Sequence, residues 1–269
     1  MVSIGPDANG TIGRVDHLLR ATALAEARHF WFLGFRRFVT PLLGRATVGL
    51  SAARLLDCGC GTGANLEILS RYGHAYGFDL TAVGLQLGRD AGRTRLARAS
   101  VAGIPFPSDA FDVVTSFDVL YALEPPVERA AAAEMYRVTR SGGFLIVNVA
   151  AMDVLKGDHS VLGHEVRRYN RGSLRRLLEG GGFEIVRITH TNASLFLPML
   201  AVRTLQRWRG LRPEAQANQD ISVPPAPVNA LLTAVLVVES WWMRVLDSPV
   251  GSSLLCLARK PARAGTKTP

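Results

Sequence analysis

Cysteine is scarce in this sequence. The chain of 269 residues has three cysteines, Cys58, Cys60 and Cys256, which are too few and too unevenly placed for a disulfide framework. Cys58 and Cys60 are separated by one residue, whereas metal and redox pairs have a two-residue spacer. We therefore expect a reducing compartment.

Long apolar runs are also absent from the sequence. No stretch reaches the roughly 18 uninterrupted apolar residues of a membrane span, and the nearest candidate, residues 230–245, is interrupted by Glu239 and Arg244. The N-terminal residues lack the charged start, apolar run and cleavage site of a signal peptide. These absences predict a cytoplasmic protein, either soluble or peripheral at the inner face of the membrane.

Acidic residues are fewer than basic ones. Lys and Arg number 31 against 22 Asp and Glu, which gives a formal net charge of +9 and a pI near 10.2. This balance favours an anionic partner such as a nucleic acid, anionic lipid headgroups or a phosphorylated substrate. The alternative is that the excess of basic residues reflects an arginine-rich composition without any anionic partner. A hydrophobic content of 48% excludes a disordered chain.

Strand and helix patterns alternate from Arg54 onward. Short apolar runs predict strands at 54–57, 75–79, 96–99, 111–116, 143–149, 183–190 and 253–259. Helical spacing of apolar residues predicts helices at 62–71, 81–93, 126–139, 171–180 and 228–246. The alternation predicts an α/β fold with a doubly wound, Rossmann-like, mostly parallel seven-stranded sheet and a C-terminal antiparallel strand.

The segments outside this alternation predict the domain organisation. Two helical segments are expected between residues 15 and 43, with a break near Gly34 or Pro41. The predicted parts are an N-terminal helical cap or lid (1–50), a cofactor-binding core (51–190), a helical and loop insertion (191–250), and the last strand with a polar tail (251–269).

The most informative motif follows the first predicted strand. It reads Asp57-Cys58-Gly59-Cys60-Gly61-Thr62-Gly63. Glycines let the backbone approach a ligand closely, so the motif predicts a nucleotide-like cofactor at the carboxyl edge of the sheet. The spacing Gly59-x-Gly61-x-x-Ala64 also fits the permissive pattern for NAD or FAD.

Asp57 favours one of these cofactors. A carboxylate just before the glycines would repel a pyrophosphate at the helix N-terminus, whereas it would attract the sulfonium and amino groups of S-adenosylmethionine. Asp79 ends the second predicted strand, where an acidic side chain can hold the ribose hydroxyls of either cofactor. The sequence therefore favours S-adenosylmethionine over a dinucleotide.

Four further motifs follow in order. They are Ile104-Pro105-Phe106-Pro107, Phe111-Asp112-Val113-Val114, Asp118-Val119-Leu120 and Arg140-Ser141-Gly142-Gly143. With the glycine motif they resemble the class I methyltransferase superfamily, in particular its small-molecule branch, over about residues 50 to 190. The resemblance implies S-adenosylmethionine-dependent methyl transfer to a small-molecule substrate, with an O, N or carboxylate acceptor. The apolar and basic residues after position 190 would suit a lipid-linked acceptor, and the net positive charge would suit an anionic one.

The resemblance also implies the cofactor-binding residues. It places Asp57 and the glycines around the methionine part, Asp79 on the ribose, and Phe117 with Asp118 beside the cofactor. The full predicted set is Asp57, Cys58, Gly59, Gly61, Gly63, Asp79, Leu80, Ser100, Val101, Phe117 and Asp118.

The sequence departs from the family pattern at two places. Many relatives have an aspartate before the Ile-Pro-Phe motif that bonds the adenine amino group, whereas this chain has Ser100 followed by Val101. The adenine contact then falls to the Ser100 hydroxyl or to the backbone. Many relatives also have a histidine after the fourth strand, where this chain reads Leu120-Tyr121-Ala122-Leu123, so a base is absent at that point.

Candidate catalytic residues follow the fifth predicted strand instead. His159 and His164 have the right intrinsic pKa for a base near neutral pH, and Arg168 and Tyr169 complete a candidate acceptor wall in which Arg168 would hold an anionic group. The alternative is that His164 and Arg168 only fasten the loop. The two histidines lack a third ligand nearby, so we predict no metal.

Aromatic residues outside the core predict two surface features. His29, Trp31 and Phe32 would either cover the cofactor or pack between helices. Residues 195–209 combine apolar, basic and aromatic side chains as interfacial helices do, which predicts weak contact with an anionic membrane surface. An acceptor-pocket cap or a dimer contact would explain the same residues.

Other functions remain open. An NAD(P)-dependent oxidoreductase shares the glycine motif, and a non-catalytic S-adenosylmethionine-binding subunit would keep the fold. Methylation of nucleic-acid bases is disfavoured, because amino-directed base methyltransferases usually have Asn or Asp followed by two prolines after the fourth strand, where this chain reads Ser116-Phe117-Asp118-Val119.

Overall fold

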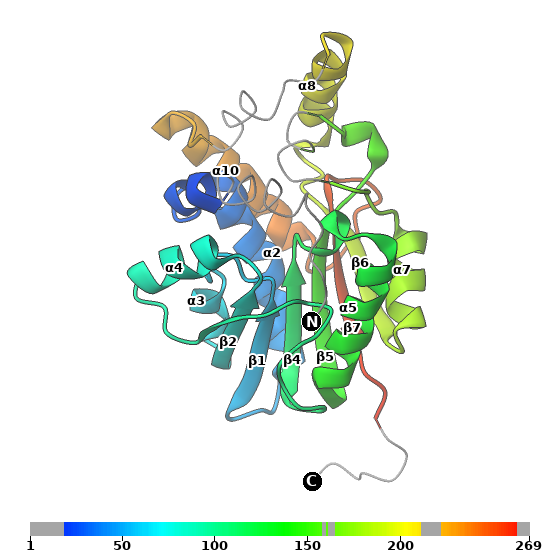
Figure 1. Cartoon of the computed structure of the whole chain (residues 1–269). Coiled ribbons are helices and arrows are strands. Elements are labelled where there is room, and N and C mark those ends of the chain that lie inside the picture. Colours follow the sequence, from blue (N-terminus) through cyan, green and yellow to red (C-terminus); the bar gives the residue numbers. More distant parts are fainter. Residues whose placement is uncertain (1–18, 158–159, 161–164, 211–221, 263–269) are drawn as a thin grey trace, which may run out of the picture.

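The computed structural model of the chain describes residues 19–157, 160, 165–210 and 222–262. A sheet of seven strands in the order β3-β2-β1-β4-β5-β7-β6 forms its centre (Figure 1). The strands are β1 (Ala53–Cys58), β2 (Gly73–Asp79), β3 (Leu96–Arg98), β4 (Phe111–Phe117), β5 (Thr139–Ala150), β6 (Glu184–Thr191) and β7 (Ser253–Arg259). β7 is antiparallel to β5 and β6, and the other neighbours are parallel. The predicted fold class is confirmed.

Helices cover both faces of this sheet. The helices with described bounds are α2 (Phe30–Ala46), α3 (Leu66–Leu69), α4 (Ala82–Asp90), α5 (Pro125–Val138), α7 (Arg171–Gly180), α8 (Phe196–Trp208) and α10 (Ala226–Trp242), with short 3-10 turns η1 (Leu120–Ala122) and η2 (Asp153–Leu155). α5 and α7 pack on one face, while α2, α3 and α10 pack on the other. Neighbouring residues such as Leu55 and Leu56 therefore both enter a core, which explains the continuous apolar runs of these strands.

The expected helical break near Gly34 or Pro41 is wrong, because α2 continues through both residues. The break lies at residues 26–29, between a helical segment at 19–25 and α2. His29 caps α2 by accepting a hydrogen bond from Trp31 N at its Nδ1 (3.2 Å). Gly34 is explained by packing, since a Cβ there would lie 2.4 Å from Leu236 Cδ1 of α10.

Other elements also differ from the predicted bounds, most clearly α3, β5 and α8. α3 is shorter than the helix expected at 62–71, and β5 begins at Thr139 and not at 143. The apolar run and the basic-aromatic patch predicted before residue 210 form one helix, α8. No helix in the described ranges is long and apolar enough to cross a bilayer.

The strand order determines where a ligand would bind. It reverses between β1 and β4, which pair side by side in parallel. In open α/β sheets, ligands bind at the carboxyl ends of the strands beside such a reversal. Asp57 of β1 and Phe117 of β4 reach this edge.

Candidate functional site

A glycine turn joins β1 to α3 at this edge of the sheet. Gly59, Gly61 and Gly63 have φ angles of 78°, 56° and 77°, a left-handed region that residues with a Cβ adopt only at a cost. A Cβ on Gly59 would also lie 2.4 Å from Val119 Cγ2. Gly59 donates its backbone N–H to Phe78 O at 2.9 Å, which ties the turn to β2. Both the conformation and the close approach therefore require glycine.

Asp57 begins this turn with a buried carboxylate that is 1% exposed. Thr115 Oγ1 donates to Asp57 Oδ1 at 2.7 Å, whereas Oδ2 has no hydrogen-bond partner among the described residues. Burial raises the pKa of Asp57 to about 7; the Thr115 bond opposes the shift and the charge of Asp79 adds to it. A buried carboxylate with an unpartnered oxygen fits the amino or sulfonium group of S-adenosylmethionine and does not fit a pyrophosphate.

Asp79 connects the end of β2 to the glycine turn. Its Oδ2 accepts from Gly61 N at 2.8 Å, and its Oδ1 accepts from Thr81 N at 2.8 Å and Thr81 Oγ1 at 2.5 Å. A carboxylate has about four acceptor sites, so one remains for a ribose hydroxyl. The side chain thus has a role in shaping the turn that the sequence did not indicate.

The other predicted cofactor-binding residues differ in which of their atoms a ligand could contact. The Cys58 side chain lies in the core, so this residue can offer only backbone atoms to a ligand. Leu80 is 59% exposed. Ser100 Oγ accepts from Ala102 N at 3.2 Å, which leaves its hydroxyl proton to donate, and Val101 packs against the core.

Phe117 and Asp118 end β4 beside the turn. Phe117 packs edge-on against Phe35 of α2, with 4.9 Å between ring centroids. Asp118 has a φ of 60° and accepts from Asn148 Nδ2 at 3.0 Å. It keeps solvent access, yet the protein packed around its carboxyl raises its pKa to about 7; the Asn148 bond opposes the shift and Glu165 adds to it. Asp118 is therefore poised to exchange a proton near neutral pH.

Two of the four predicted catalytic residues fasten the segment after β5. Arg168 forms a buried ion pair with Glu165 at 2.8 Å and donates to Ala151 O at 3.1 Å. The Tyr169 hydroxyl bonds to Glu128 of α5 inside the core, and this contact with burial raises the pKa of Tyr169. These contacts match the fastening role that was the alternative for Arg168, and a catalytic role for Arg168 or Tyr169 stays a prediction.

His159 and His164, the other two predicted catalytic residues, lie outside the described residues. Their role as bases stays a prediction. Among the residues that are described, no three His, Cys, Asp or Glu side chains form a group that could hold a metal ion.

The N-terminal helical segment covers the glycine turn through residues that the sequence did not single out as site residues. Leu19 Cδ2 lies 3.2 Å from the position that a Cβ on Gly61 would take. Glu26 is buried, and its carboxylate accepts from Thr62 Oγ1 at 2.7 Å and pairs with Arg93 at 3.3 Å. We call Leu19, Glu26, Thr62 and Arg93 the cap contacts. Their sequence signals are the position of Glu26 three residues before His29 and that of Thr62 within the glycine motif.

For His29 and Phe32, which were predicted either to cover the cofactor or to pack between helices, the structure shows contacts within the helical region. His29 is buried as the cap of α2, with its pKa lowered by burial. Its ring stacks on Phe30 at 4.5 Å and meets Phe32 edge-on at 6.0 Å. Phe35, one turn along, makes the contact with Phe117 of the site.

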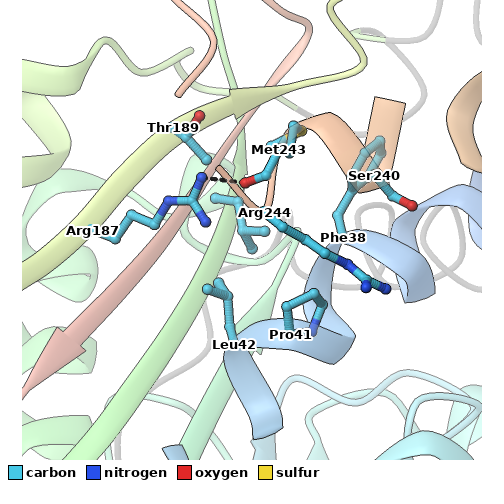
Figure 2. A pocket seen from close by; sticks show the side chains of 9 residues that line it. Phe38, Pro41, Leu42, Arg187, Thr189, Ser240, Met243 and Arg244 are labelled. Atoms are coloured by element: carbon cyan, nitrogen blue, oxygen red, sulfur yellow. Dashed lines mark hydrogen bonds between the residues drawn. The ribbon is translucent and has the colours of Figure 1, made fainter. Parts of the chain in front are cut away.

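A small cavity lies away from this turn, between α2, α10 and the strands β6 and β7 (Figure 2). Its volume of about 10 Å³ holds little more than one water molecule. Arg187 crosses its wall, donates to Met243 O and pairs with Asp247 at 2.8 Å. The cavity is a gap in helix packing and is too small for an organic ligand.

Comparison with known proteins shows which proteins this chain is similar to. Residues 56–147 match the family described as Methyltransferase domain. The ubiquinone/menaquinone biosynthesis C-methyltransferase UbiE of Stutzerimonas stutzeri is 35% identical over 38% of this chain and 45% of its own length. Malonyl-[acyl-carrier protein] O-methyltransferase of Herminiimonas arsenicoxydans is 30% identical over 55% of this chain and 56% of its own.

A solved structure extends the similarity in fold. Phosphoethanolamine N-methyltransferase 2 of Haemonchus contortus, in complex with S-adenosyl-L-methionine, aligns with a TM-score of 0.57 at 16% identity, over 91% of this chain and 57% of that one. The chain spans about half the length of the two curated relatives.

Proposed function

Because this chain belongs to the class I S-adenosylmethionine-dependent methyltransferase superfamily, we propose that it transfers a methyl group from S-adenosylmethionine to an oxygen, nitrogen or carboxylate acceptor on a small-molecule or lipid-linked substrate. The observation that carries the proposal is the buried Asp57 carboxylate with its unpartnered Oδ2 at the glycine turn. A cation satisfies this oxygen, and a diphosphate does not.

Different residues around the glycine turn would contact different parts of the cofactor. Asp57 would pair with its amino group, and the remaining acceptor site of Asp79 would take a ribose hydroxyl. The backbone of the glycine turn would lie against the methionine part. The cap contacts would close the turn from the side of the N-terminal segment.

Methyl transfer asks little of the protein beyond positioning. When bound, S-adenosylmethionine supplies a methyl group on a sulfonium, which is an already activated leaving group. Orientation and exclusion of water can then supply most of the rate. An acceptor hydroxyl would still need to lose a proton, and Asp118 is the described carboxylate at this edge whose pKa is raised to about 7 while it keeps solvent access.

The names of the curated relatives share methyl transfer and differ in the acceptor. One is a C-methyltransferase of ubiquinone and menaquinone biosynthesis, and the other is an O-methyltransferase of malonyl-acyl carrier protein. The acceptor class of this chain is therefore our proposal, drawn from its basic charge and its apolar insertion helices.

Binding titrations test the cofactor assignment. Calorimetry with S-adenosylmethionine, S-adenosylhomocysteine and NAD⁺ should show affinity for the first two only. Asp57→Asn should weaken S-adenosylmethionine binding by about tenfold or more, because a charge-assisted contact is worth roughly 1.5–3 kcal/mol. Asp90→Asn on exposed α4 is the matched control and should bind normally. Binding of NAD⁺ in place of the methyl donor would overturn the proposal.

Turnover separates an enzyme from a non-catalytic binding subunit. The purified protein, incubated with labelled methyl donor and with metabolite and lipid extracts, should release S-adenosylhomocysteine and transfer label to an extract component. A protein that binds the donor tightly but transfers no label to any fraction would be a binding subunit.

A further inference from the structure

The outward side of α10 is apolar along its whole length. The exposed positions follow one another at alternating spacings of four and three residues, which keeps them on one side of a helix. They continue into the turn after the helix and form what we call the outer stripe, Pro227, Leu231, Ala234, Val238, Trp241 and Val245. Leu231, Trp241 and Val245 are 64%, 60% and 84% exposed, and Trp242 beside them is 63% exposed.

The opposite side of α10 already has its partner in the fold. Leu236 packs against Gly34 of α2, and the Asn229 side chain donates to Arg28 O and accepts from Phe30 N. Glu239 accepts from Ala193 N and Ser194 N, which ties α10 to the start of the α8 segment. The packing of residues 19–157, 165–210 and 222–262 therefore does not explain the outer stripe.

α8 repeats this arrangement. Within α8, Gln206 is the one buried residue. Leu197, Leu205 and Trp208 are 72%, 58% and 86% exposed. In Figure 1 the helix projects beyond the end of the sheet toward which β4 points, which is the edge that bears the glycine turn. Isolated exposed apolar residues are common, but continuous apolar stripes mark contact surfaces.

Most charged side chains within these helical segments are basic, although the exposed carboxylates of Asp247, directly after residue 246, and of Asp153, in η2 beside α8, lie next to them. Residues 192–210 and 222–246 contain a single acidic residue, Glu239, and that residue is buried. The arginines of the same segments, Arg203, Arg207, Arg209 and Arg244, leave a positive charge beside exposed tryptophans. Tryptophan, leucine and arginine together characterise helices that lie at the boundary between lipid headgroups and acyl chains.

We propose that the outer stripe and the exposed side of α8 form a surface that binds an anionic lipid bilayer. Apolar side chains and the indoles of Trp208, Trp241 and Trp242 would enter the headgroup region, and the arginines would contact anionic headgroups. This inference does not depend on the proposed methyl transfer. If both hold, the membrane lies close to the edge of the sheet where an acceptor would enter.

Vesicle flotation tests the proposal. The full chain is mixed with vesicles of phosphatidylglycerol and phosphatidylcholine at moderate salt, and with vesicles of phosphatidylcholine alone. We expect flotation with the anionic vesicles, at least tenfold weaker partitioning to the neutral ones, and a marked loss at high salt. Protein that stays at the bottom of the gradient with anionic vesicles overturns the proposal.

Two variants identify the surface. Trp241→Ser with Trp242→Ser should reduce partitioning at least tenfold. Val48→Ser, which changes a 79% exposed residue in the loop before β1, is the matched control and should float like the wild type. Because the changed residues are exposed, both proteins should fold, and circular dichroism checks this. A double variant that floats like the wild type overturns the assignment of the surface.

Sedimentation velocity tests the main competing occupant, a second copy of the chain. The proposal expects a monomer in vesicle-free buffer for both the wild type and the double tryptophan variant. A wild-type dimer that the double variant converts to monomer would assign the outer stripe to self-association and overturn the membrane surface. Blue-shifted tryptophan fluorescence on adding anionic vesicles, reduced in the double variant, supports insertion of the indoles.

Discussion

At the scale of single residues, Asp79 combines two roles in one carboxylate. It accepts from Gly61 N of the glycine turn and from Thr81 N at the start of α4, and it is predicted to accept from the ribose. Asp79→Ala should weaken S-adenosylmethionine binding by roughly 1–3 kcal/mol, because a charge-assisted hydrogen bond is lost, and should also lower the melting temperature, because Gly61 N loses its acceptor. Calorimetry and thermal denaturation measure the two effects.

The two effects of this substitution can be separated with a ligand that lacks the ribose. Methionine alone should bind wild type and Asp79→Ala with affinities that differ only by the change in the turn. If S-adenosylmethionine affinity is unchanged in the variant, the ribose assignment is wrong. If both ligands lose affinity equally, Asp79 acts on the turn alone.

The sequence identified the residues that carry a local pattern. Asp57 and the glycines form a contiguous motif whose backbone geometry is now explained by positive φ angles. Glu26 and Asn148 carry no such pattern, because their partners Thr62 and Asp118 are distant in the chain. Arg168 and Tyr169 were predicted from their place after the fifth strand, and their partners Glu165 and Glu128 could not be read from the sequence.

At the scale of elements, Gly34 measures how closely α2 and α10 pack. A glycine-to-alanine change inside a helix usually stabilises it by up to about 1 kcal/mol. Here the new Cβ would lie 2.4 Å from Leu236 Cδ1, so Gly34→Ala should instead destabilise the protein by about 1–3 kcal/mol. Denaturant unfolding gives the free energy.

Gly44 in the same helix is the control for this prediction. A Cβ there meets nothing within 4 Å, so Gly44→Ala should leave the stability unchanged or raise it by up to about 1 kcal/mol. A Gly34→Ala protein as stable as Gly44→Ala would show that the two helices do not pack as closely as the structure has them.

The cap contacts give a second prediction at this scale. Glu26→Ala removes the acceptor of Thr62 Oγ1 and the partner of Arg93, so the N-terminal segment should loosen over the glycine turn. We expect a loss of cofactor affinity of about 3- to 30-fold, although Glu26 is assigned no contact with the cofactor, together with faster hydrogen exchange in residues 19–29. Glu184→Ala at the exposed start of β6 is the control.

An unchanged affinity in Glu26→Ala, with faster exchange, would mean that the cap is structural and does not assist binding.

Element order was predictable because parallel strands and their helices follow apolar periodicity. The position of the break between the first two helices was not predictable. Gly34 was interpreted as a turn, whereas it allows close contact between α2 and α10, whose contacting residue is about 200 positions away in the chain.

At the scale of the whole molecule, two carboxyl groups connect stability to pH. The surrounding protein raises the pKa values of Asp57 and Asp118 from 3.8 to about 7. The folded protein therefore binds more protons than the unfolded chain between about pH 4 and pH 7. This contribution to stability is fully present below the unfolded pKa and is lost as pH rises through 7.

Asp57→Asn removes the titration of the Asp57 carboxyl and should isolate the contribution of that group to the pH dependence of stability. The melting temperature of the variant relative to wild type should rise between pH 5 and pH 8, by roughly 2–4 °C for each kcal/mol. Burial lowers the pKa values of His29 and His190, which gives a slope of the opposite sign near pH 6.5. That slope is common to both proteins and cancels in the difference.

Adding S-adenosylmethionine should raise the melting temperature of the wild type more than that of Asp57→Asn at alkaline pH. A cation beside Asp57 favours the ionised carboxylate, so binding releases a proton and tightens as pH rises from 6 to 8 in the wild type. The melting temperature gained from a fixed cofactor concentration should then grow with pH in the wild type and stay flat in Asp57→Asn. Equal pH dependence in the two proteins would mean that Asp57 is not the carboxylate that meets the cation, and the binding site would have to be sought around Asp118.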